Sequence, residues 1–455
     1  MLNPYSLSWV VVTLLIFGPC APSEAARLVN VAFQSNATSG NMLLHGTIVY
    51  PDGPPPAGGY PPAILIGGSG PGNRWLNATA SYLSTQLPGE LPTQPYGDFH
   101  FCYFRTQFVS PYYDITTWLA DSAGMAVLTW DKRTCLVGRR CNGGSCGCQN
   151  VPCATSKQTN CLHVGLILNT DFIDDSINAL SYLLFSQTLV KVDPTRAAVL
   201  GHSAGAVQAP IVALNFTAAH VKQVVLLAGP ASPILTTTSR QLATQVVEST
   251  AWVNGSICNA SVPQQAQLLN ILASGLPSSQ AALQSINEQN ALLASGYYNA
   301  TPPFTPVSIA GVAAPLLFWQ QAIAFSTFQS AATNIQSYLT QSQPTTLLAI
   351  NSDQDLEVSP YEFFPLRAIL GAFPSSAQGA VIPYLTHFLT DSSNLDPHVS
   401  VEPLELLKCY FTASHLRSCV AQGSPAKQRT LASRQSLPSN SEDAFVLKQF
   451  TSFSL

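Results

Sequence analysis

The sequence predicts an α/β protein built on a mostly parallel central sheet with helices on both of its faces. Apolar segments without strict alternation recur along the chain, as expected for strands that are covered on both sides. Segments with helical spacing lie between them, and strands that alternate with helices are typical of βαβ units. The chain has 455 residues and is 46% hydrophobic, which is enough for a large core.

The strands and helices follow one another in a regular order. Candidate strands with their turns span residues 45–53, 61–72, 125–131, 194–205, 221–230, 345–355 and 379–387. A helix is predicted over 169–185, where apolar residues recur at helical spacing. Asn169 or Thr170 at its start can act as N-cap. A second helix is predicted over 206–214, directly after a strand and a tight turn.

Three insertions interrupt this pattern. A polar insertion runs from about Leu76 to Pro111, and a Cys-rich insertion covers about 134–162. From about 231 to 343 the segments look helical, with no clear strand between them, which predicts a helical cap inserted into the sheet domain. A separate helical domain is the alternative, and the cap is favoured because the other connections between strands are short.

The two ends of the chain are expected to lie outside the folded domain, which we place at 26–419. Residues 1–25 contain an apolar run that is shorter than the ~20 residues needed to span a bilayer and is followed by small residues, as in a cleaved signal peptide. No basic residue precedes the run, so an uncleaved anchor is the alternative. Residues 420–455 are Ser-rich and aperiodic, which predicts a poorly ordered tail.

Cysteines and sequons also favour an exported, glycosylated protein. Of 11 cysteines, Cys20 would leave with the signal peptide, and an even number in an exported chain indicates disulfides. A metal site is the alternative, but the Cys-rich insertion has no C-x-x-C pair. Cys409 and Cys419 could pair locally. Candidate N-glycosylation sites are Asn36, Asn77, Asn215, Asn254, Asn259 and Asn299.

The charge distribution argues against a nucleic-acid partner. Only 9% of the residues are charged and the net charge is −4. No block of Lys or Arg is present to neutralise phosphates or to bind an anionic membrane. Apart from the N-terminal run, no segment is long and apolar enough to span a membrane. The predicted signal peptide, the cysteines and the sequons together predict a secreted mature chain.

The central motif is Gly201-His202-Ser203-Ala204-Gly205, which has the form G-x-S-x-G. An apolar strand precedes it and a predicted helix follows, as in a nucleophile elbow. A Ser hydroxyl needs a base to take its proton, and the sharp turn exposes Oγ to such a base. An ordinary turn is the alternative interpretation, which the strand–turn–helix context disfavours.

An acid and a base are expected further along the chain, in the order Ser, Asp or Glu, His. Asp353, Asp355 and Glu357 follow a predicted strand, and loops at the carboxyl ends of parallel strands carry functional groups. His387 directly follows the last predicted strand, so we predict it to be the base. The alternatives are His398, in a turn-like setting, and His415, close to the last cysteines.

Backbone N–H groups should stabilise the oxyanion that forms on the substrate. The first is expected from Ala204, which follows the nucleophile. The second is expected from the Gly-rich loop at 67–70, whose small residues let the backbone approach a substrate closely. A plain turn is one alternative, and a phosphate-binding loop is disfavoured because the Walker pattern is absent.

With these motifs in place, the sequence resembles the α/β-hydrolase esterases related to dienelactone hydrolases and to bile-acid-CoA:amino-acid N-acyltransferases. The closest pattern is that of the bacterial esterase branch with a GSGP…R loop. The matching pieces run in family order over most of residues 45–390: GTIVYPDG, ILIGGSGPGNR, VLTWDKR, DFIDDSINALSYL, VDPTRAAVLGHSAGAVQAP, VVLLAGPASPIL, AINSDQDLEV and YLTHFL.

The resemblance implies an α/β-hydrolase fold with Ser203 as nucleophile, His387 as base and Asp355, rather than Asp353, as acid. It also implies that Gly68 or Ser69 supplies the second oxyanion N–H. One departure concerns the pattern D-K-R-G-x-G, because here Asp131-Lys132-Arg133 continues into Thr134-Cys135 and the Cys-rich insertion.

These observations together predict a secreted carboxylesterase that acts through an acyl-enzyme on a small-molecule or polymer-derived ester, with no cofactor and no metal. A peptidase, thioesterase or acyltransferase could use the same triad, because one fold supports many reactions. A binding protein that has kept the fold and lost activity is an alternative of another class. The oligomeric state is left open.

Overall fold

The computed structural model describes a large part of the chain. The described residues are 26–38, 40–68, 72–84, 101–135, 169–216, 218–231, 253–254, 305–309, 312–325, 328–341, 345–352, 355, 357–358, 362–383, 385–391 and 396–412. The predicted signal peptide (1–25), the predicted tail (420–455) and nearly all of the predicted Cys-rich insertion lie outside these residues, as do Ser69, Asp353 and His415.

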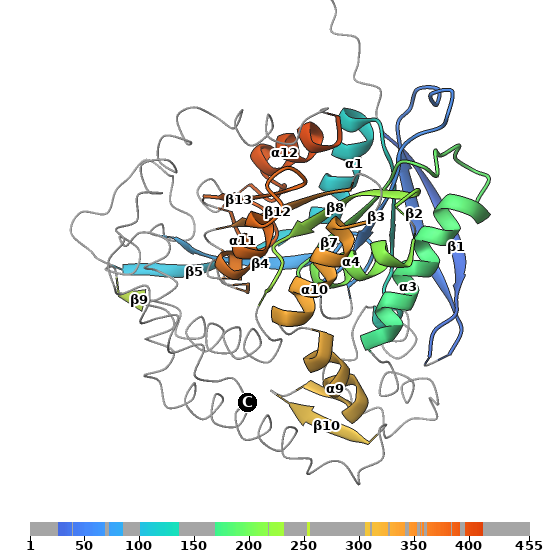
Figure 1. The fold of residues 1–455 in the computed structure, drawn as a ribbon. Coiled ribbons are helices and arrows are strands. Elements are labelled where there is room, and N and C mark those ends of the chain that lie inside the picture. The colour runs from blue at the N-terminus through green and yellow to red at the C-terminus, as the bar shows by residue number, and fades with distance from the viewer. Residues whose placement is uncertain are drawn as a thin grey trace, which may run out of the picture.

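The centre of the molecule is an eight-stranded sheet, drawn in Figure 1. Its strands, in spatial order, are β1 (Arg27–Ser35), β2 (Met42–Tyr50), β6 (Ala126–Trp130), β3 (Pro62–Ile66), β7 (Ala197–His202), β8 (Val221–Leu227), β12 (Thr346–Ser352) and β13 (Ala377–Ile382). The pairs β1–β2 and β2–β6 are antiparallel, and every pair from β6 to β13 is parallel.

Helices cover both faces of this sheet. The helices α3 (Asn169–Ser181), α4 (Ala204–Asn215), α10 (Phe328–Leu339) and α11 (Phe363–Gly371) contribute to one hydrophobic core. The helices α1 (Pro111–Ala123) and α12 (Val401–Thr412) contribute to a second core and contact each other, as Figure 1 shows. A short π-helix, Tyr182–Ser186, extends α3.

Alternation along the buried strands explains the two cores. In β3, Ile64 and Ile66 pack into the first core, whereas Ala63 and Leu65 pack into the second. All residues of β3 are buried, which accounts for an apolar run without polar alternation. The predicted fold is therefore confirmed: this is an α/β-hydrolase fold, with the G-x-S-x-G turn at the end of β7.

Both ends of helix α1 carry sequence signals that did not enter the sequence analysis. Helix α1 has Pro111 in its first turn, where the missing N–H costs no hydrogen bond. The residue that follows it, Gly124, caps the helix with a φ of 66°, in the left-handed region that closes helix C-termini. The turn returns the chain directly to β6, so α1 is tightly joined to the strand that precedes Asp131.

Two of the predicted insertions contain strands. The insertion from Leu76 to Pro111 includes an antiparallel hairpin of β4 (Ala78–Ser84) and β5 (Phe101–Val109). The dipeptide β9 (Val253–Asn254) pairs with β5, so a piece of the predicted cap joins this hairpin.

The expectation of a cap without strands is wrong for its described part. The hairpin of β10 (Pro306–Ile309) and β11 (Val312–Pro315) precedes α9 (Leu316–Phe325), a helix that was predicted. Cross-strand hydrogen bonding between these two short runs outweighs their weak local pattern. Helix α10 also packs on α4 and buries Tyr338 in the first core, so the end of the predicted cap segment is part of the sheet domain.

Within the part of the chain that the structure describes, no helix has the length and apolarity that a membrane crossing requires.

Candidate active site

Ser203 occupies a strained turn between β7 and α4. Its backbone φ is 55° and its ψ is −124°, a conformation that is costly for a residue with a Cβ. The turn is held by hydrogen bonds from Ser203 N to Leu227 O (2.8 Å) and from Ala206 N to Ser203 O (2.9 Å). A strained Ser between a buried strand and a helix is the geometry of a nucleophile elbow.

The glycines of the motif are required by close backbone approach. A Cβ on Gly201 would overlap the carbonyl of Gly205, and a Cβ on Gly205 would overlap the carbonyl of Ile66 at the end of β3. The elbow is therefore packed directly against the strand that leads into the Gly-rich loop. Ala204 is the first residue of α4, where backbone N–H groups have no acceptor within the helix.

Asp355 and His387 form a buried hydrogen-bonded pair. Asp355 Oδ2 lies 2.8 Å from His387 Nδ1, and both residues are at most 4% exposed. The other oxygen of Asp355 accepts hydrogen bonds from the backbone N–H groups of Glu357 (2.9 Å) and Val358 (2.7 Å). The carboxylate is thus fixed in the orientation that keeps a proton on Nδ1 and leaves Nε2 to act as base.

A second carboxylate approaches the opposite nitrogen of the ring. Glu357 Oε2 lies 3.5 Å from His387 Nε2, and the Glu357 side chain is 44% exposed. Burial alone would lower the pKa of His387, but the charges of Asp355 and Glu357 raise it to about 9. Partial removal of the Glu357 carboxyl from water raises its pKa above its usual range, although the charge of His387 acts to lower it.

His387 stands in a turn that is anchored to neighbouring segments. Ser352 Oγ, at the end of β12, donates to Thr386 O (3.1 Å), and Thr386 N donates to Thr390 O (2.9 Å). His202, the residue before the nucleophile, packs its ring 4.7 Å from that of His387, centroid to centroid. The base turn and the nucleophile elbow are therefore neighbours in the fold.

The Gly-rich loop also reaches Ser203. A Cβ on Gly68 would lie 2.8 Å from Ser203 Cβ and 3.3 Å from Ser203 Oγ, so only glycine fits there without a shift. The N–H of Gly68 donates to the hydroxyl of Tyr112 (3.0 Å), and the carbonyl of Gly68 accepts a hydrogen bond from Lys132 Nζ. Both polar groups of Gly68 are thereby engaged by side chains. The other predicted donor, Ser69, lies outside the described residues.

The first two residues of the triplet that follows β6, Asp131 and Lys132, hold this loop in place by different contacts. Asp131 binds Arg74, with Arg74 Nη2 2.9 Å from Asp131 Oδ2. Lys132 Nζ lies 4.4 Å from the centre of the Phe172 ring as well as bonding Gly68. Burial lowers the pKa of Lys132 to about 8.

Arg133, the third residue of the triplet, is buried and forms an ion pair with Asp175 of α3. Its Nε lies 2.8 Å from Asp175 Oδ2 and its Nη2 lies 2.5 Å from Oδ1. Helix α3 is thereby tied to the end of β6, beside the loop that carries Gly68.

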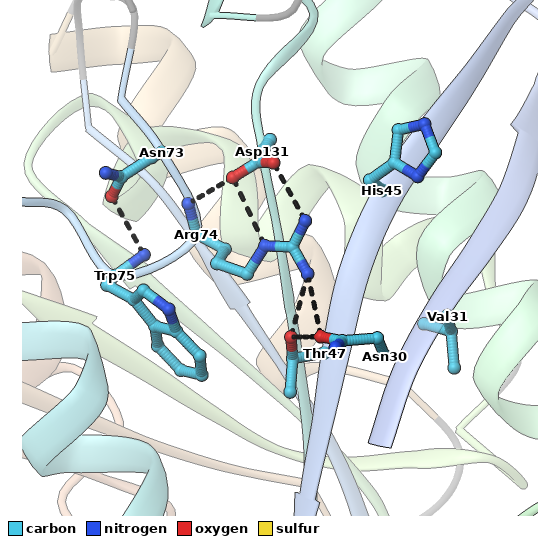
Figure 2. Close-up of a pocket in the computed structure, with 8 residues that line it drawn as sticks. All are labelled: Asn30, Val31, His45, Thr47, Asn73, Arg74, Trp75 and Asp131. Carbon is cyan, nitrogen blue, oxygen red and sulfur yellow. Dashed lines mark hydrogen bonds and ion pairs between the residues drawn. The ribbon is translucent and has the colours of Figure 1, made fainter. Parts of the chain in front are cut away.

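A polar pocket lies beside the ion pair of Arg74 and Asp131. Its volume is about 490 Å³, and none of Ser203, Asp355 and His387 lines it. Figure 2 shows the Arg74 guanidinium between Asp131 and the pair of Thr47 and Asn30. Because these groups bind one another, we assign the Arg74 contacts to loop anchoring and not to substrate binding.

The alternative base His398 lies away from the candidate site. Its side chain is 71% exposed and bonds Asp114 on α1. The contacts of Tyr112, Lys132 and His202 were missed by sequence reasoning. The D-K-R pattern was the only signal for Lys132, and the position before the nucleophile was the only signal for His202.

Among the described residues, no group of three or more His, Cys, Asp or Glu side chains has an arrangement suited to a metal ion.

Comparison with known proteins finds no matching family model and no matching curated sequence. Solved structures of similar fold include the Pyrobaculum calidifontis esterase, with 10% identity, 85% of both chains covered and a TM-score of 0.39. The carboxyl esterase 2 of Tuber melanosporum has 11% identity, with 87% of this chain and 89% of that chain covered and a TM-score of 0.41.

The Pyrococcus horikoshii acylaminoacyl peptidase has 13% identity and a TM-score of 0.44, with 86% of this chain but 42% of that chain covered. Likeness at this level concerns the fold alone, and the fold of this chain rests on its own strand order. The chain is therefore defined as an α/β-hydrolase-fold protein whose candidate site contains Ser203, His387 and Asp355.

Proposed function

We propose that this protein is a serine hydrolase, and most specifically a carboxylesterase. The observation that carries the proposal is the buried His387–Asp355 pair, with Nδ1 2.8 Å from Oδ2, next to an elbow whose Ser203 has a φ of 55°. A carboxylate that is fixed by two backbone N–H groups can hold the imidazole in one tautomer and stabilise its charged form.

In the proposed reaction, Ser203 Oγ attacks the ester carbonyl carbon while His387 Nε2 takes the hydroxyl proton. The oxyanion accepts hydrogen bonds from backbone N–H groups, one of them from Ala204. Because the N–H of Gly68 already donates to Tyr112, we assign the second donor to Ser69. His387 then returns the proton to the departing alcohol, and a water that it activates releases the acid from Ser203.

Export is part of this proposal. Three of the candidate glycosylation sites, Asn36, Asn77 and Asn215, have exposed side chains. Cys135 and Cys409 are disulfide-bonded, a state that an oxidising compartment favours. Expression in a eukaryotic secretory host should yield protein in the medium that loses mass on treatment with an N-glycosidase. Retention in the membrane fraction would instead support the uncleaved anchor.

A fluorophosphonate probe tests the nucleophile directly. The wild type should be labelled, Ser203→Ala should not, and the exposed helix variant Ser337→Ala should be labelled like the wild type. Absence of labelling in a folded, disulfide-intact wild type would favour a binding protein that has lost activity.

Substrate classes are separated by leaving group. We expect p-nitrophenyl esters to be cleaved with a kcat/KM at least about 100-fold above that for peptide p-nitroanilides, a difference of roughly 2.7 kcal/mol in activation free energy. Faster cleavage of the anilides would indicate a peptidase. Preferential turnover of acyl thioesters, or transfer to an added amine, would indicate a thioesterase or an acyltransferase on the same triad.

A further inference from the structure

His202 is buried between the two loops that carry the candidate catalytic groups. It is 2% exposed, and its side chain has a hydrogen-bond partner at each ring nitrogen. Nδ1 lies 3.1 Å from the hydroxyl of Tyr112, and Nε2 lies 2.9 Å from the backbone carbonyl of His387. The hydroxyl of Tyr112 in turn accepts a hydrogen bond from Gly68 N.

The chemistry of these partners sets the position of every proton. A carbonyl oxygen only accepts hydrogen bonds, so His202 Nε2 must carry a hydrogen. In the neutral ring Nδ1 then lacks one and accepts from the Tyr112 hydroxyl. That hydroxyl oxygen is left to accept from Gly68 N. The donors therefore run in one direction, from Gly68 through Tyr112 and His202 to His387.

We propose that His202 is a positioning residue that, in its neutral Nε2–H form, locks the turn of the base His387 to the nucleophile elbow and, through Tyr112, to the Gly68 loop. The proposal rests on the proposed function, because it concerns how that site is assembled. His202 is the neighbour of Ser203 in the chain, so it connects nucleophile, base and oxyanion loop through one side chain.

The surroundings of His202 favour the neutral ring. Its neighbours are the rings of Tyr112, His387 and Phe388, at centroid distances of 5.7, 4.7 and 5.9 Å. Burial lowers the pKa of His202 to about 3, and the charge of the nearby His387 contributes a smaller part of this shift. A protonated His202 would place a hydrogen on Nδ1, and the Tyr112 hydroxyl could then no longer donate to it.

An ordinary buried histidine with satisfied hydrogen bonds would show the same static contacts. The difference is that a positioning residue affects the reaction step, whereas a purely structural residue affects stability. The experiments must therefore report on the tautomer of His202 and on the chemical step separately from the amount of folded protein.

The first experiment is independent of catalysis. The full chain contains 8 histidines, and ¹⁵N-histidine labelling allows the ring nitrogens of His202 to be assigned by comparison with His202→Gln. We expect one protonated Nε2 and one unprotonated Nδ1, unchanged from pH 5 to pH 8. Titration of His202 within this range, or a proton on Nδ1, would overturn the proposal.

The second experiment measures the rate of fluorophosphonate labelling and the kcat and KM of ester cleavage, below the melting temperature of each variant. His202→Leu should slow labelling by roughly 10- to 100-fold, with kcat lowered and KM within about 3-fold of the wild type, because buried hydrogen-bond partners are left unsatisfied. His202→Gln keeps a side-chain N–H donor and should recover at least about 5-fold of the loss. His398→Gln, a change at an exposed histidine, should have no effect.

A double-mutant cycle tests whether Tyr112 acts through His202. Tyr112→Phe should slow labelling by about 5- to 50-fold, and the double variant Tyr112→Phe/His202→Leu should be no more than about 3-fold slower than the slower single variant. Fully multiplicative effects, or a His202→Leu enzyme with wild-type kcat and only a lowered melting temperature, would refute the positioning role. If the wild type fails to label while the tautomer result holds, the proposed function fails and the hydrogen-bonded link remains.

Discussion

Glu357 Oε2 lies 3.5 Å from His387 Nε2, so the imidazole of the candidate base is held between two carboxylates, with Asp355 at its other nitrogen. Nε2 is also the atom that must be unprotonated to accept the Ser203 proton. A half-exposed acid at this atom stabilises the protonated ring and so opposes the base function at low pH.

Glu357→Gln should move the acid limb of the pH profile to lower pH. The pKa of His387 is raised to about 9, and removing a nearby negative charge lowers it, so more of the base is neutral at a given pH. We expect kcat/KM to reach its half-maximal value about half to one pH unit lower, and the shift should shrink in high salt. Glu405→Gln on α12 is the matched control. A shift toward higher pH would contradict the assigned interaction.

Asp355→Asn should remove nearly all activity without unfolding the protein. An amide cannot hold the imidazole in the same tautomer or stabilise its charged form, and the loss in kcat should be roughly 10³- to 10⁴-fold. Steady-state ester hydrolysis measures it, with Asp353→Asn as the matched control that should stay near wild type. If Asp353→Asn caused the larger loss, the acid would be assigned to the wrong residue.

Gly68→Ala and Gly67→Ala should differ sharply although they are neighbours. The new Cβ would lie 2.8 Å from Ser203 Cβ at position 68, but at position 67 its nearest contacts are at an ordinary 3.5 Å. A displaced nucleophile should lower kcat/KM by about 100-fold or more in Gly68→Ala. Gly67→Ala should stay within a few-fold of wild type. Equal activity in the two variants would show that the Gly68 loop is not placed as described.

The buried ion pair between Arg133 and Asp175 should matter for stability. The two side chains are 1% and 2% exposed, so Asp175→Asn removes the carboxylate of a buried ion pair. We expect the free energy of unfolding to fall by about 3–5 kcal/mol, measured by chemical denaturation under non-reducing conditions. Asp52→Asn breaks the exposed pair with Arg27 and should leave the midpoint unchanged. An equally unchanged midpoint for Asp175→Asn would mean that this ion pair contributes little to holding α3 in place.

Local chemistry made much of this protein predictable from its sequence. The G-x-S-x-G turn constrains consecutive residues, and Gly201 and Gly205 are needed because the backbone itself passes so close. Buried strands of a parallel sheet appear as apolar runs, which is why β3, β6, β7, β8 and β12 could be placed. The order of the motifs predicted His387 as base and placed an acid among three carboxylates, and the family resemblance implied that this acid is Asp355. The structure pairs Asp355 with His387.

Other features depend on contacts between residues far apart in the chain, and a linear pattern carries no signal for them. Tyr112 and His202 are 90 positions apart, and His202 and the His387 carbonyl are 185 apart. The strands β10 and β11 also form through cross-strand pairing more than through local preference. Sequence alone therefore determined the fold class, Ser203 and His387, because these rest on local backbone requirements and on chain order. It reached Asp355 only through the family resemblance. Only the tertiary structure decided which side chains orient them, because hydrogen-bond partners are chosen by proximity in space.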